Sequence, residues 1–149
     1  MMNEIQRALV AIDFSDKSDS VIQWAISIAK AHHAELILVH VSNSDPDFVG
    51  YGPGPQTVRD QVAHDLNDEH RQLQQLAESI TAQQVVVQTH CLQGTVVETI
   101  LEKAKTDKAD LIIVGSHGHG GLFRAVLGSI SEGIVRHSPS PVVVVPTRG

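Results

Sequence analysis

Cysteine and aromatic residues are scarce in this chain, and both shortages narrow the possible folds. Cys91 is the only cysteine among 149 residues, so neither an intramolecular disulfide nor a cysteine-rich zinc site can form. This usage is typical of a reducing compartment, and we expect a cytoplasmic protein. Aromatic residues make up only 3% of the sequence. The core must therefore be built from valine, isoleucine, leucine and alanine, as in parallel sheets covered by helices.

Two further absences exclude classes of partner. The chain has 11 lysines and arginines against 17 acidic residues, a formal net charge of −6, and no dense basic patch. We therefore expect it to bind neither nucleic acid nor an anionic membrane surface. No apolar run is long enough to span a bilayer, and residues 1–7 lack the pattern of a secretion signal, so we expect no membrane insertion.

The length and composition indicate one folded unit. Hydrophobic residues make up 42% of the chain and charged residues 19%, which are ordinary values for a globular protein. A chain of 149 residues is near the usual size of one domain. Since no linker or change of composition divides it, we expect a single domain over residues 1–149.

Short aliphatic runs alternate with helical patterns along the whole chain, which is typical of an α/β protein with a parallel sheet. The expected strands are residues 8–12, 36–41, 85–91, 110–115 and 142–145. The spacing of apolar residues predicts helices after residue 16, over about 57–81, after residue 95 and over about 129–137. Two of these helices begin with the pattern of a capping box, at Thr95 to Glu98 and at Ser129 to Glu132.

The segment from Gly115 to Ser131 is the most informative about function. It carries four glycines between positions 115 and 121, and a fifth, Gly128, directly before a predicted helix. Successive backbone N–H groups in such a loop, together with a helix N-terminus, can hold a phosphate chain. A Walker loop and the dinucleotide motif are both absent. In the alternative interpretation, Ser129 only caps the helix and Gly115 only ends a strand.

Glycines at positions 115, 118 and 128, followed by Ser129, have a specific spacing: a glycine, two residues, a glycine, nine residues, a glycine and a serine. In this respect the chain resembles the ATP-binding branch of the universal stress protein family. The similarity extends to residues 10–15, 109–118 and 141–145, and so to nearly the whole chain. One departure is His119, where family members often carry arginine.

The resemblance implies a Rossmann-like fold of the adenine nucleotide alpha hydrolase type: a five-stranded parallel sheet in the order 3-2-1-4-5 with helices on both faces. Asp13 and Val41 are then expected to contact adenosine, Val41 through its backbone, while Gly118, Gly128 and nearby serines hold the phosphates. Asp13 has an alternative role as N-cap of the first helix. The full predicted nucleotide site consists of Ala11, Ile12, Asp13, Val41, Val114, Gly115, Gly118, Gly128, Ser129, Ile130 and Ser131.

By the same resemblance, we expect an ATP-binding regulatory protein of the stress response, with Mg²⁺ beside the ATP, an unidentified protein partner and a homodimer formed through the fifth strand. ADP and AMP stay open as ligands. One alternative is an enzyme that hydrolyses ATP slowly with His117, His119 or Arg124. Another is an interaction protein without nucleotide, which would have no steric need for so many glycines. We expect no metal site made from histidines, because His32-His33 and His117-x-His119 do not supply three or four converging ligands.

Overall fold

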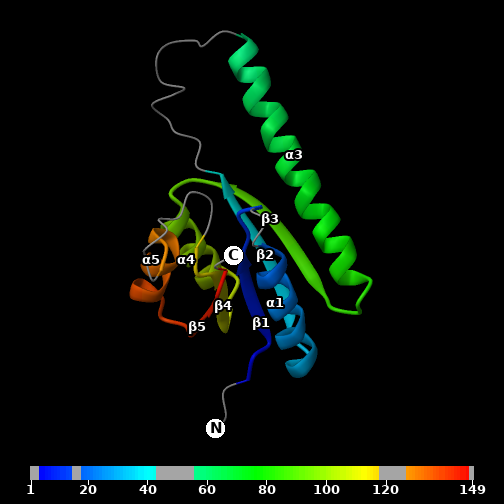
Figure 1. Cartoon of the computed structure of the whole chain (residues 1–149), viewed down its shortest axis with the longest axis vertical. Helices are drawn as coiled ribbons and strands as arrows, with labels where there is room; N and C mark the ends of the chain where they lie inside the picture. The colour runs from blue at the N-terminus through cyan, green and yellow to red at the C-terminus, as the bar shows by residue number, and fades with distance from the viewer. Residues whose placement is uncertain (1–3, 15–17, 43–55, 118–126, 148–149) are drawn as a thin grey trace.

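The computed structural model describes residues 4–14, 18–42, 56–117 and 127–147. Strands and helices alternate through these residues, as the sequence predicted (Figure 1). The strands are β1 (Arg7–Ala11), β2 (Glu35–Ser42), β3 (Val87–Gln93), β4 (Leu111–Gly115) and β5 (Val142–Val145). The helices are α1 (Ser18–His32), α3 (Gln56–Thr81), α4 (Val96–Thr106) and α5 (Ser129–His137).

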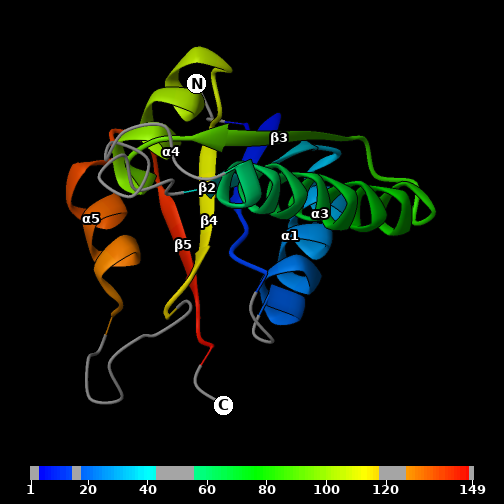
Figure 2. The ribbon, with the colours of Figure 1, turned by 90° about the horizontal axis from the view of Figure 1, so that it is seen from above.

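The five strands form one parallel sheet in the order β3-β2-β1-β4-β5, which confirms the predicted fold class. Helices α1 and α3 lie on one face of the sheet, and α4 and α5 lie on the other (Figures 1 and 2). The chain therefore winds outward in both directions from the neighbouring strands β1 and β4. The carboxyl ends of these two strands meet at the switch point where ligands collect in open parallel sheets.

Each face of the sheet has its own aliphatic core. Because side chains alternate along a strand, Ala8 and Val10 of β1 pack toward α1 and α3, while Leu9 packs toward α4 and α5. Helix α1 shows how the sequence builds such a layer. Its buried residues recur at spacings of three and four, so they form one stripe against the sheet: Val21, Ile22, Ala25, Ile26 and Ala29.

Three local predictions differ from the structure, the third only in part. Strand β3 begins at Val87, two residues later than expected, because Val85 is buried ahead of the strand and the first ladder bond is made by the Val86 carbonyl. Ser129 does not cap α5 either. The N-cap is Gly128, whose carbonyl accepts the N–H of Glu132 at 2.9 Å, and Ser129 is the first helical residue. Thr95 is the N-cap of α4 as expected, but its side chain makes no capping hydrogen bond.

Candidate functional site

The switch point brings together two of the residues that the sequence predicted for the site. Pairing between β1 and β4 ends at Val10 and Ile113, and Asp13 and Gly115 each follow just beyond that end. Both residues therefore lie at the carboxyl edge of the sheet, on adjacent strands. This is the arrangement that the predicted adenosine and phosphate contacts require.

The alternation of backbone hydrogen bonds also directs Val41 toward this edge. In β2 the odd-numbered residues bond to β1: Glu35 donates to Gln6, and Val39 accepts from Ile12, both at 2.9 Å. Val41 is the next odd residue, and β1 has already ended at Ala11. Its N–H and C=O are thus directed to the side where β1 no longer continues. This orientation suits the backbone contact predicted for Val41.

Asp13 lies two residues beyond the end of β1. Its Oδ1 accepts a hydrogen bond of 3.1 Å from the Ser18 hydroxyl. The interpretation of Asp13 as N-cap is wrong, because the residue that follows it, Phe14, is not helical. The next residue, Phe14, has a φ of 60°, a left-handed conformation that costs a residue with a side chain about 1–2 kcal/mol. Other contacts must therefore hold this turn in place.

Beside the residues predicted to contact phosphate, Thr147 ties the end of β5 to the segment after β4. Its Oγ1 accepts from the backbone N–H of His117 at 3.0 Å and donates to the His117 carbonyl at 2.9 Å. The Thr147 N–H donates to the Ser116 Oγ at 3.0 Å, and that oxygen lies 3.0 Å from Nδ1 of His117. Since these three side chains are buried, they fix the two residues that directly follow Gly115, the first glycine of the predicted loop.

The start of α5 is anchored to the same segment. The Gly128 N–H donates to the Ser116 carbonyl at 2.6 Å, and the Ser131 hydroxyl lies within hydrogen-bond distance of the Ser116 and Gly128 carbonyls, at 2.9 and 3.0 Å. Ser131 is therefore engaged inside the protein, with only 3% of its surface exposed. Ser129 and Ile130 are exposed, and the N–H groups of the first turn have no acceptor within the helix. These are the groups that could receive an anion.

Packing supplies a steric reason for two glycines of the motif that needs no ligand. A Cβ on Gly128 would lie 3.2 Å from the Ser116 carbonyl oxygen, and a Cβ on Gly115 would lie 3.0 Å from Cγ2 of Thr147. The expectation that a nucleotide-free protein would have no such need is therefore wrong for these two positions. Gly118, His119 and Arg124 lie outside the described residues.

The remaining predicted residues line the same edge. Ile12 and Val114 are buried and Ala11 is partly buried; the Ile12 N–H is taken by Val39 and its carbonyl by the side chain of His40. Across the described part of the chain, no group of three histidine, cysteine, aspartate or glutamate side chains could hold a metal ion. No helix described here is long and apolar enough to cross a membrane.

Sequence analysis missed Ser116, Thr147 and His40 as parts of this edge. The signal for Thr147 was the strand order itself, because Gly115 pairs with Val145 and so places Thr147 opposite His117. The signal for His40 was a single polar residue in an otherwise aliphatic strand. To place either residue at this edge, the register between neighbouring strands must be known, and the pattern of one sequence does not supply it.

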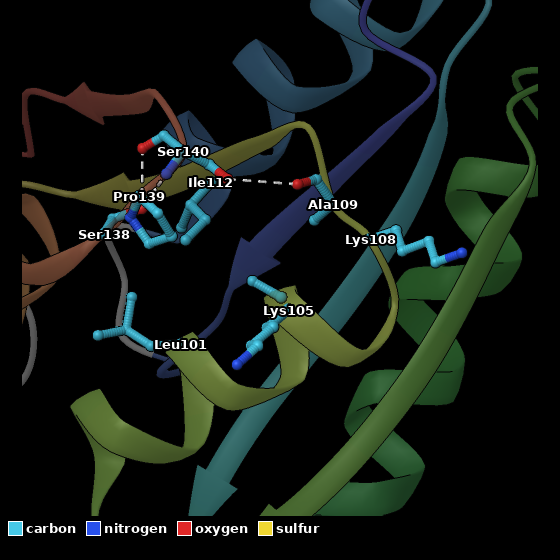
Figure 3. Close-up of a pocket in the computed structure, with 9 residues that line it drawn as sticks. Leu101, Lys105, Lys108, Ala109, Ile112, Ser138, Pro139 and Ser140 are labelled. Atoms are coloured by element: carbon cyan, nitrogen blue, oxygen red, sulfur yellow. Dashed lines mark hydrogen bonds between the residues drawn. The ribbon is translucent and has the colours of Figure 1, made fainter.

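A pocket of about 210 Å³ lies at the opposite edge of the sheet, where β4 and β5 begin (Figure 3). Leu101, Ala104 and Ile112 line it, with Lys105 and Lys108 also contributing. The Ser140 hydroxyl reaches the Ala109 carbonyl at 3.5 Å across one side of it (Figure 3). None of the predicted nucleotide-binding residues that the structure describes lines this pocket, so it is separate from that part of the candidate site.

Comparison with known proteins identifies the protein family of this chain. The model of the universal stress protein family matches residues 4–146. The chain belongs to this family. It is 32% identical to universal stress protein MJ0531 of Methanocaldococcus jannaschii, over 96% of this chain and 83% of that one. It is 31% identical to universal stress protein YxiE of Bacillus subtilis, over 93% and 97%. It spans 47% of the length of a relative from Mycolicibacterium smegmatis, a universal stress protein to which it is 31% identical.

Solved structures share the fold of this universal stress protein. The hypothetical protein MJ0577 superposes with a TM-score of 0.84 at 22% identity, covering 99% of both chains. A universal stress protein in complex with cAMP has a TM-score of 0.71 at 24% identity, over 98% of this chain and all of the other. One from Archaeoglobus fulgidus in complex with dAMP has a TM-score of 0.69 at 18% identity, over 94% and 97%.

Proposed function

We propose that this universal stress protein binds an adenine nucleotide, ATP together with Mg²⁺, and acts as a cytoplasmic regulatory module of the stress response by presenting the bound state to a protein partner. The observation that carries the proposal is the position of Asp13 and Gly115 at the ends of two adjacent strands, where the winding of the sheet reverses. The complexes of its structural neighbours with cAMP and dAMP support an adenine nucleotide as the ligand class.

In this proposal the two ends of the nucleotide meet different chemistry. The Asp13 carboxylate accepts hydrogen bonds from hydroxyl or amino groups of adenosine, and the backbone of Val41 lies on the same side. The N–H groups at the start of α5 and those of the glycine loop hold the phosphates. Such groups attract an anion without a basic patch, which reconciles phosphate binding with the chain's net charge of −6.

Mass spectrometry of ligand released by denaturing the purified protein tests the ligand class directly. Titration calorimetry with ATP, ADP, AMP and inorganic triphosphate, each with and without Mg²⁺, then separates the contributions of adenosine, phosphate and metal. Protein that releases no nucleotide and binds none of these four ligands would overturn the proposal.

Asp13→Asn is the sharpest variant for the adenosine end. The asparagine Oδ1 can still accept from the Ser18 hydroxyl, so the turn is kept while the negative charge is lost. We expect ATP affinity to fall about tenfold, which corresponds to the loss of about one charge-assisted hydrogen bond, with triphosphate affinity unchanged. Asp19→Asn, on an exposed position in the first turn of α1, is the matched control. Equal losses of ATP and triphosphate would contradict the role assigned to Asp13.

We also propose a homodimer through β5, which is an edge strand of the sheet. Ile112 donates to the Pro141 carbonyl and Ser116 to the Val145 carbonyl. In this register the N–H groups of Val143 and Val145 face β4, and those of Val142 and Val144 face the open edge. An unpaired edge of this kind is a template for a second copy related by two-fold symmetry.

A further inference from the structure

A buried histidine is attached to the turn that carries Asp13. His40 lies in β2 with 9% of its surface exposed. Its Nδ1 donates a hydrogen bond of 2.7 Å to the carbonyl of Ile12, directly before Asp13. Its ring packs on Phe14, directly after Asp13, with the ring centroids 4.4 Å apart and the planes tilted by 44°. His40 therefore contacts both neighbours of Asp13.

The other side of the His40 ring is held by α3. Nε2 lies 3.3 Å from Oε2 of Glu69, and the same carboxylate oxygen accepts a hydrogen bond from the Ser42 hydroxyl. On the neighbouring strand β3, Cys91 is the register partner of His40. Burial raises the pKa of the Cys91 thiol, and the Glu69 carboxylate raises it further. The imidazole thus bridges an acidic side chain on α3 and a backbone carbonyl at the end of β1.

We propose that His40 is a positioning residue for the adenosine end of the nucleotide, an inference that rests on the function proposed above. Its Nδ1–H bond fixes the Ile12 carbonyl, and its ring supports Phe14 in the left-handed conformation. Together these contacts set the direction in which the Asp13 carboxylate leaves the sheet. Glu69 holds the ring from the other side, so the orientation of Asp13 depends on a contact with α3.

Three substitutions of His40 separate the contributions of its two ring nitrogens, Nδ1 and Nε2. Asparagine places an amide N–H close to the position of Nδ1 and can keep the bond to Ile12. Glutamine places its amide N–H near the position of Nε2, so it can reach Glu69 but loses the bond to Ile12. Alanine loses both contacts. His90→Asn is the matched control, because His90 is a partly buried histidine in β3 whose contacts lie with Gln88 and Asp107 rather than with β1.

Calorimetry with ATP and with inorganic triphosphate gives a readout that a purely structural role would not produce. We expect His40→Ala and His40→Gln to lower the affinity for ATP at least fivefold. Their affinity for triphosphate should stay within twofold of wild type. His40→Asn and His90→Asn should bind both ligands within twofold of wild type. The inference fails if all three His40 variants bind ATP normally, if ATP and triphosphate weaken together, or if His40→Asn loses as much ATP affinity as His40→Ala.

A measurement without nucleotide keeps this test independent of the proposed function. Residual dipolar couplings of the Asp13 and Phe14 N–H vectors report the orientation of the turn in the free protein. They should change in His40→Ala and His40→Gln and stay the same in His40→Asn. A wild type that binds no adenine nucleotide would end the proposed function, whereas unchanged couplings in His40→Ala would end the positioning role itself.

Discussion

Replacing Thr147 with valine should destabilise the protein strongly, although the residue lies beyond the last strand. Valine keeps the shape of threonine and its Cγ2 methyl, but it exchanges the hydroxyl for a second methyl group. Both hydrogen bonds between that hydroxyl and the His117 backbone, at 3.0 and 2.9 Å, are then lost. Thr147 has only 5% of its surface exposed, so the freed N–H and C=O of His117 do not readily find water.

The magnitude follows from these contacts. One hydrogen bond of ordinary net strength contributes about 1 kcal/mol, and losing the other leaves a buried backbone donor unpaired, which costs about 1–3 kcal/mol. We therefore expect Thr147→Val to lower the free energy of unfolding by about 2–4 kcal/mol. With an m-value of about 2 kcal/mol/M for urea, the midpoint of unfolding should fall by about 1–2 M.

Urea denaturation followed by circular dichroism measures this change, and two companion variants show its source. Thr147→Ser restores the hydroxyl and loses only the methyl that packs near Gly115, so it should cost about 1 kcal/mol. Thr106→Val, on an exposed position at the end of α4, should stay within about 0.5 kcal/mol of wild type. A Thr147→Val protein that unfolds within 0.5 kcal/mol of wild type would refute the reasoning.

Three further predictions concern assembly, pH and turnover. Val144→Pro removes an N–H from the open edge of β5 and should give a monomer in light scattering. Val143→Pro should instead unfold the strand, because the N–H of Val143 faces β4. A dimeric and folded Val144→Pro protein would exclude this interface. Burial, and after it Lys103, lowers the pKa of His90 below its ordinary value of 6.5, while Asp107 opposes this shift. The folded protein therefore favours the neutral imidazole. Because the unfolded chain takes up the proton first, the free energy of unfolding falls as the pH drops below about 6.5. Urea midpoints at pH 7 and pH 5.5 should therefore differ more for wild type than for His90→Gln. ATP turnover should take minutes or longer per event, and a rate near 1 s⁻¹, usual for enzymes, in a phosphate-release assay would favour the hydrolytic alternative.

The strands were predictable because each aliphatic run is short and ends at a polar residue, a glycine or a proline, whereas their order was predicted from the resemblance to the universal stress protein family. Leu111 to Gly115 shows this clearly, since an apolar run ending in glycine has few interpretations other than a buried strand. The bounds of β3 were less accurate. Val85 is as apolar as the strand itself, but it is buried before the ladder begins, and apolar character alone does not distinguish the two roles.

The site was predictable only in part, because its contacts join residues far apart in the sequence. Asp13 and the glycine motif carry local patterns. In contrast, the bond between His40 and Ile12 spans 28 residues, and the bonds between Thr147 and His117 span 30. The capping box at Ser129 failed for a related reason: Gly128 is the N-cap and its N–H donates to the Ser116 carbonyl, a contact across 12 residues that a local pattern of helix caps does not include.

The close packing of the glycines changes what the motif implies in this family. Gly115 approaches Thr147, and Gly128 approaches the Ser116 carbonyl. A Cβ at either position would require these atoms to shift by a few tenths of an ångström, whether or not a nucleotide binds. Packing therefore favours glycine at both positions independently of the ligand. Of the described positions that define the spacing, only Ser129 is exposed and makes no internal side-chain hydrogen bond, so packing does not account for it. Substitutions of Gly128 test folding and binding together, whereas Asp13→Asn and the His40 variants test binding with the start of α5 left intact.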